Sequence, residues 1–142
     1  MVSRSLRAAG AVGTALWLLT ACGGEPAVCE LVDGVPEVSV TWRAAELPYG
    51  EASTYRLCVG TRCESGTPRA YGDGLRVVMH LLDDFDERRP RVDLRLSGPT
   101  GTPKLDESRT ITLRDERAGC DQALTGALRL TADGVLEEPD KS

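Results

Sequence analysis

The chain has few aromatic residues and a single histidine. Of its 142 residues only 4% are aromatic, and His80 is the one imidazole. A metal site built from several histidines is therefore excluded, and a serine or cysteine nucleophile would have only His80 as an imidazole base. No GxSxG, HExxH or P-loop pattern occurs in the chain. The sequence thus predicts a protein that is not an enzyme and needs no cofactor.

Basic residues are also too few for a nucleic-acid partner. The chain has 17 Lys and Arg against 22 Asp and Glu, a formal net charge of −5. Binding to a nucleic-acid backbone needs a basic face, so nucleic acid is not the expected partner. The hydrophobic fraction, 41%, is too high for a disordered chain, and the length fits one domain.

The long apolar run of a membrane-spanning helix is missing as well. Arg4 and Arg7 stand at the N-terminus without any acidic residue, and residues 8–21 follow without a charge. A bilayer span takes about 17 or more apolar residues, whereas a secretory signal combines a basic start with a shorter apolar region. We therefore interpret residues 1–21 as a signal peptide.

This signal ends in Leu19-Thr20-Ala21-Cys22. The four residues resemble the lipobox of bacterial lipoproteins, in which the cysteine receives a diacylglyceryl group. The resemblance implies a lipid on Cys22. In its layout, and in having 15 Arg but two Lys, the chain also resembles the functionally unassigned small secreted lipoproteins of high-GC Gram-positive bacteria. This second resemblance implies an anchor on the outer face of the plasma membrane but no functional residues. The alternative is an ordinary signal peptide that leaves Cys22 as a free thiol.

The mature chain is expected to contain one domain. Residues 22–28 would form a short lipid-anchored tether, residues 29–136 the domain, and residues 137–142 a disordered acidic tail. Apolar and polar residues alternate along 37–43, 91–97, 110–114 and 128–130, and two further candidate strands are 28–32 and 54–59. This period of two is typical of antiparallel strands with one buried face. We predict an all-β fold: an antiparallel β-sandwich, immunoglobulin-like in outline, with about seven or eight short strands.

One segment, residues 75–89, fits two interpretations. As a strand it would turn Leu75, Val77 and Met79 inward; as an amphipathic helix it would end before Pro90. The adjacent valines and the surrounding strands favour a strand.

The five cysteines are an odd number, which in an exported protein needs an explanation. A lipid on Cys22 leaves four for two disulfides. Gly60 and Thr61 fit a two-residue hairpin turn, which places Cys58 opposite Cys63 at a non-hydrogen-bonded site where side chains lie closest. Cys29 and Cys120 then pair by elimination. A redox or metal pair is the alternative for Cys58 and Cys63, but their spacing is not that of a redox motif.

Two features could bind a ligand or a partner. Tyr49 and Tyr71 lie in turn-like segments and would form a recognition surface if their loops share one end of the fold. The acidic run in residues 83–87 offers oxygen ligands for Ca²⁺, without the spacing of an EF-hand, through four carboxylates: Asp83, Asp84, Asp86 and Glu87.

These patterns together favour a lipid-anchored extracytoplasmic protein without catalytic activity. Within that class we expect a module that interacts with a protein partner in the cell envelope, through loops or an exposed strand edge. The alternative is an accessory lipoprotein that binds a small ligand or Ca²⁺ through the acidic loop 83–87.

Overall fold

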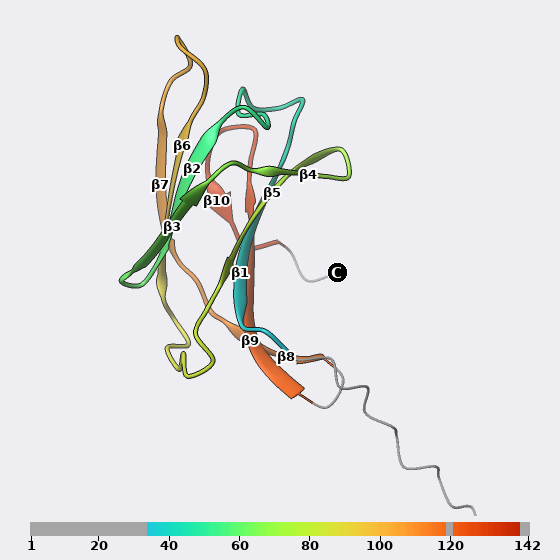
Figure 1. The fold of residues 1–142 in the computed structure, drawn as a ribbon, viewed down its shortest axis with the longest axis vertical. Helices are drawn as coiled ribbons and strands as arrows, with labels where there is room; N and C mark the ends of the chain where they lie inside the picture. Colours follow the sequence, from blue (N-terminus) through green and yellow to red (C-terminus); the bar gives the residue numbers. More distant parts are fainter. Residues whose placement is uncertain (1–33, 119–120, 140–142) are drawn as a thin grey trace, which may run out of the picture.

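The chain folds into ten β-strands arranged in two sheets, as a computed structural model shows for residues 34–118 and 121–139 (Figure 1). The residues that it describes contain no helix, and so none with the length and hydrophobicity of a membrane span. The predicted all-β class is therefore confirmed. The ten strands exceed the seven or eight expected, and one pair of strands in the larger sheet is parallel, which corrects the purely antiparallel prediction. The finer, immunoglobulin-like outline stays a prediction.

The larger sheet, sheet A, has its strands in the order β10-β9-β1-β5-β4, and β8 also pairs with β9. The first long strand, β1, is antiparallel to β5 and parallel to β9. Thr125 of β9 pairs with Glu37 of β1 and also with Arg114 of β8. Since one residue can pair with two strands only on its two sides, β1 and β8 lie along opposite edges of β9. The strands are β1 (Glu37–Arg43), β4 (Arg69–Tyr71), β5 (Gly74–His80), β8 (Arg114–Ala118), β9 (Asp121–Leu130) and β10 (Leu136–Glu137).

The smaller sheet, sheet B, is antiparallel throughout, in the order β3-β2-β6-β7. Its strands are β2 (Thr54–Val59), β3 (Arg62–Gly66), β6 (Arg91–Ser97) and β7 (Leu105–Thr110). The chain passes from β3 to β4 through Thr67 and Pro68, so it changes sheets there within two residues. This crossing brings the edge of sheet B next to the edge of sheet A.

One hydrophobic core lies between the sheets. The alternation predicted for 37–43 and 91–97 is confirmed: in each strand the apolar residues are buried, and most of the polar ones between them are at least partly exposed. Sheet A contributes Val38, Val40 and Trp42 from β1, and sheet B contributes Val92, Leu94 and Leu96 from β6. Burial of these apolar faces is the main term that holds the two sheets together.

The ambiguous segment is a strand over its first half. Residues Gly74–His80 form β5, with Leu75, Val77 and Met79 buried at 3%, 2% and 0% exposure. The strand interpretation is therefore confirmed and the helical alternative is wrong. The neighbours decide this, because β1 and β4 offer strand partners on both sides of β5.

The strand predicted at 110–114 is wrong. β7 ends at Thr110 and β8 begins at Arg114, so Ile111 and Leu113 lie between strands although both are buried. Their N–H groups donate to the backbone oxygens of Pro90 and Arg88, at 3.1 and 2.8 Å. The alternation thus marks a buried segment in which the chain crosses from sheet B to sheet A.

The folded domain extends beyond its predicted end at residue 136. Glu137 belongs to β10, and a carboxylate oxygen of Glu138 accepts a hydrogen bond from the backbone N–H of Thr112 at 3.0 Å. The predicted segments 1–21 and 22–28 and the candidate strand 28–32 lie outside the described residues.

Candidate functional site

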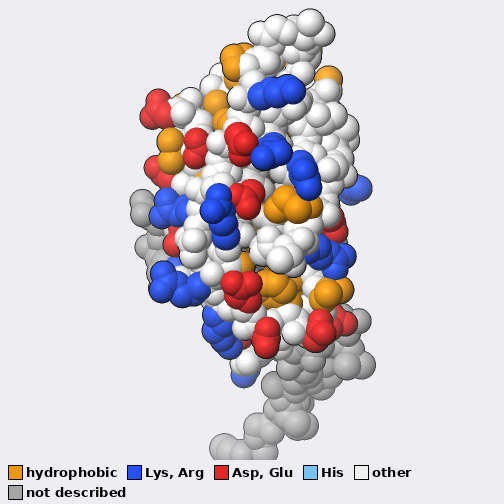
Figure 2. Space-filling view, turned by 90° about the vertical axis from the view of Figure 1, so that its left-hand side faces the viewer, with side chains coloured by type: hydrophobic (Ala, Val, Ile, Leu, Met, Phe, Trp, Pro, Cys, Tyr) orange, Lys and Arg blue, Asp and Glu red, His pale blue; other side chains and the backbone are white. Residues whose placement is uncertain are grey.

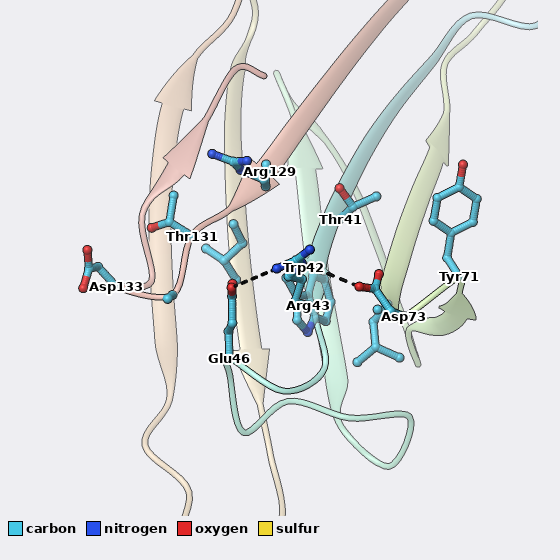
Figure 3. Close-up of a pocket in the computed structure, with 13 residues that line it drawn as sticks. Thr41, Trp42, Arg43, Glu46, Tyr71, Asp73, Arg129, Thr131 and Asp133 are labelled. Atoms are coloured by element: carbon cyan, nitrogen blue, oxygen red, sulfur yellow. Dashed lines mark ion pairs between the residues drawn. The ribbon is translucent and has the colours of Figure 1, made fainter. Parts of the chain in front are cut away.

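Two hollows on sheet A meet at Tyr71, whose side chain is 57% exposed. The first, of about 570 Å³, lies where β1 and β9 end and β5 begins (Figure 3). The second, of about 530 Å³, lies beside β4 and β5, and we call it the β5 groove. The residues that line the β5 groove are Glu37, Tyr55, Thr67, Arg69, Ala70, Tyr71, Arg76, Val77, Val78 and His80.

The first hollow is polar, and its basic residues are paired. Arg43 projects between two acids, with its Nη1 3.8 Å from Glu46 and its Nε 3.6 Å from Asp73 (Figure 3). Arg129 is paired with Glu137 at 3.2 Å. Such exposed ion pairs contribute little to stability, and they leave this hollow no net positive charge to attract an anion.

The start of β5 in this hollow requires glycine. A Cβ atom at Gly74 would collide with the backbone carbonyl of Trp42. Because backbone cannot move aside as a flexible side chain can, the close approach of β1 and β5 at this point depends on the missing side chain.

Tyr71 is held by an arginine of the neighbouring strand. The guanidinium carbon of Arg76 lies 5.0 Å from the centre of the Tyr71 ring, a cation–π arrangement. The same guanidinium lies 3.4 Å from a carboxylate oxygen of Glu37 on β1. Three strands of sheet A thus fix the position of an exposed aromatic ring.

The β5 groove gathers polar groups from both sheets. His80 Nδ1 lies 3.8 Å from Glu37 Oε2, and the imidazole is largely exposed. Tyr55 enters the groove from β2 of sheet B. Burial raises the pKa of Tyr55, the Glu64 carboxylate raises it further, and Arg69 lowers it. Since the net shift is upward, the Tyr55 phenol stays neutral near pH 7 and can donate a hydrogen bond.

Tyr49 is not part of an exposed surface, which corrects the predicted pairing of Tyr49 with Tyr71. Its side chain is 4% exposed, and its hydroxyl donates to the backbone oxygen of Pro103 at 2.7 Å. Its own backbone oxygen accepts a hydrogen bond from Nε1 of the buried Trp42 at 2.9 Å. Tyr49 therefore belongs to the core, and of the two predicted tyrosines only Tyr71 remains accessible.

The predicted calcium ligands do not converge. Asp83, Asp84, Asp86 and Glu87 are all exposed in the loop between β5 and β6. Across the described residues, no group of three or more acidic, cysteine or histidine side chains lies close enough to hold a metal ion. Arg88, which follows this acidic run, pairs with Asp115 of β8 at 2.8 Å.

The predicted disulfide between Cys58 and Cys63 is confirmed. The two residues lie opposite each other in the β2–β3 hairpin, with their Cα atoms 4.0 Å apart. A type II′ turn requires a positive φ at its first central residue and a negative φ at its second. Gly60, the first central residue, has a φ of 60°, and Thr61, like every other non-glycine residue described, does not have a positive φ. Because Leu57 and Val59 face the core, the disulfide lies on the outer face of sheet B. Cys22, Cys29 and Cys120 lie outside the described residues.

The outer side of sheet B carries mixed charges, with basic and acidic side chains interspersed (Figure 2). Arg91 and Arg95 pair with Asp93 and Asp106 at 3.0 and 3.1 Å. The hydroxyl of Ser108 donates a hydrogen bond to Asp93, and this bond, with further help from Arg91 and Arg95, lowers the pKa of Asp93. Most charged side chains on this face are therefore paired with one another, so fewer of them are available to bind a partner than on sheet A.

No family model, no curated protein and no solved structure matches this chain. Function is therefore inferred from the chain's own residues. Among these, Arg69 and Arg76 were not singled out from the sequence. Their significance comes from the strand register, which places them opposite each other across β4 and β5, and no local sequence pattern carries that information.

Proposed function

We propose that the protein is a non-catalytic interaction module, held at the outer face of the plasma membrane by lipid on Cys22, that binds a protein partner in the cell envelope. The observation that carries this proposal is the exposed Tyr71 ring, fixed over Arg76 between two hollows of sheet A. Tyrosine and arginine are enriched at the centres of protein interfaces, because each combines a large contact area with hydrogen-bonding groups. We also propose that the domain is immunoglobulin-like in outline.

The predicted anchor would place the partner near the membrane. Six residues separate Cys22 from Cys29, and such a segment spans about 20 Å at full extension. An acidic domain gains nothing from the anionic lipid surface itself, so the acyl chains on Cys22 would hold it there.

Replacing Cys22 with Ser is expected to release the protein from the membrane. Without the thiol no diacylglyceryl group can be attached, and stable anchoring takes two acyl chains. The measurement is fractionation of cells that express the full chain, together with the intact mass of the mature protein. The double substitution of Cys58 and Cys63 with Ser is the control, because it removes cysteines outside the lipobox without leaving a free thiol, and it should leave the protein in the membrane fraction. Unchanged fractionation of Cys22→Ser would contradict the anchor.

The interaction itself can be tested with a photo-reactive residue, p-benzoylphenylalanine, at position 71. Irradiation of intact cells is expected to give one discrete adduct from position 71, since this ring is exposed at the proposed interface. The control is the same residue at position 110, an exposed site in β7 of sheet B, which should give no such adduct. If position 71 gives no adduct, or both positions give the same set of adducts, the proposed function is wrong.

A further inference from the structure

The space beside β5 is only half filled by β4. β4 pairs with the first three residues of β5, and the last pair joins Arg69 to Arg76. The preceding residue is Pro68, which has no N–H group and cannot extend the ladder. Beyond Arg76, the edge of β5 therefore has no strand partner on the β4 side among the described residues, and the β5 groove runs along it.

The free edge of β5 presents backbone groups of two residues. The N–H of Leu81 donates to Pro36 at 2.7 Å, so it points toward β1. Along a strand, backbone groups point alternately to the two sides. The N–H and C=O groups of Val78 and His80 therefore point away from β1, into the β5 groove. In the described part of the chain no hydrogen bond to these groups is present.

The groove also holds basic side chains beyond what the neighbouring acids neutralise. Arg69 and Arg76 lie directly opposite each other, and like charges in that arrangement destabilise a sheet. Arg76 has Glu37 as a partner, whereas the described residues provide no ion pair for Arg69. In a chain with a net charge of −5, this local excess of positive charge is complementary to an acidic ligand.

We propose that the β5 groove binds an extended acidic peptide segment of the partner protein, which adds to sheet A as a strand beside Val78 and His80. The inference rests on the proposed function and deepens it by naming the site and the chemistry of the partner. The added strand pairs with the part of β5 that lies beyond Arg76, where β4 and Pro68 provide no partner. Its backbone pairs with β5, and a carboxylate on its outward face lies next to Arg69 and Arg76. Tyr55 and Tyr71 line the groove and provide apolar contacts.

The test is binding of a fluorescent pentapeptide, acetylated and amidated, in which Glu alternates with Val, to the detergent-solubilised full chain. We expect saturable binding that weakens as salt is raised, because exposed charges contribute to it. Arg69→Glu should weaken binding by about tenfold or more, which corresponds to about 1.4 kcal/mol. Methylation of the peptide's backbone nitrogens should abolish binding, since strand addition needs those donors.

Arg56→Glu is a closely matched control. Arg56 is an exposed strand residue that faces another arginine, Arg95, but it lies on sheet B. Its substitution should change the peptide affinity less than twofold. Thermal melts check that both variants are folded. Equal binding by Arg69→Glu and the unaltered chain, undiminished binding of the methylated peptide, or no binding of the acidic peptide at millimolar concentration overturns the inference.

The same substitution separates this inference from the proposed function. If the adduct formed at position 71 persists in an Arg69→Glu background and the acidic peptide fails to bind the unaltered chain, the interaction module stands and the β5 groove is not its site. If no adduct forms at position 71 in any background, the proposed function itself fails. Loss of the adduct in Arg69→Glu but not in Arg56→Glu supports both.

Discussion

Replacing Trp42 with Ala is expected to lower the free energy of unfolding by about 3–5 kcal/mol. The side chain is 3% exposed and belongs to the core between the sheets. Its removal leaves a cavity, and it also leaves the backbone oxygen of Tyr49 without its donor. Because small domains are stable by only about 5–15 kcal/mol, this single change removes a large part of the total. Urea unfolding followed by circular dichroism measures the loss; fluorescence does not serve, because Trp42 is the only Trp after the predicted signal peptide.

A second substitution of Trp42 separates its packing and hydrogen-bonding contributions, and a substitution of Tyr49 tests a different hydrogen bond beside it. Trp42→Phe keeps most of the buried area and removes the indole N–H, so it should cost less than Trp42→Ala. Tyr49→Phe removes the hydroxyl that donates to Pro103 and should cost about 0.5–1.5 kcal/mol. A loss below about 1 kcal/mol for Trp42→Ala would contradict the central role that the core assigns to this residue.

The second large effect concerns the disulfide predicted between Cys29 and Cys120. Replacing both cysteines with Ala is expected to cost about 4–5 kcal/mol, whereas replacing Cys58 and Cys63 should cost about 2 kcal/mol. The difference follows from loop-closure entropy, because the first pair closes a loop of most of the domain and the second closes a hairpin. Substituting both members of each pair avoids a free thiol. Thermal and urea unfolding of the two double variants provide the comparison.

Mass spectrometry of non-reduced peptides gives an independent check on this pairing. A linked peptide containing Cys29 and Cys120 is expected beside the Cys58–Cys63 hairpin peptide. Equal losses of stability in the two double variants, or free thiols at Cys29 and Cys120 in the exported protein, would show that the pairing by elimination is wrong.

Local patterns in the sequence predicted much of the fold. Alternation identified β1 and β6, because each of these strands buries the apolar residues of one face between more exposed polar ones. The hairpin and its disulfide could be placed from Gly60 and the spacing of two cysteines, since a two-residue turn fixes the register of both strands.

The remaining features depend on contacts between distant segments. Ile111 and Leu113 alternate like strand residues, yet they are buried by a chain crossing that no local pattern marks. Tyr49 lies in a turn-like segment, and its burial depends on Trp42 and Pro103, the latter 54 residues away. The Arg69–Arg76 pair exists only because Pro68 and the turn at Gly72 set the register of β4. The candidate site was therefore predicted only at Tyr71.

The parallel pairing of β1 with β9 has a consequence for the order in which the domain assembles. A chain that is made and exported from its N-terminus presents β1 and β5 before β9, so these two strands can associate while β9 is not yet available. Until β9 arrives, the second edge of β1 has no partner and the apolar faces of Val38 and Val40 are incompletely covered. Contacts between such distant segments also slow folding. The completed sheet therefore forms late, and the unfinished chain needs protection from edge-to-edge association until residues 121–130 are in place.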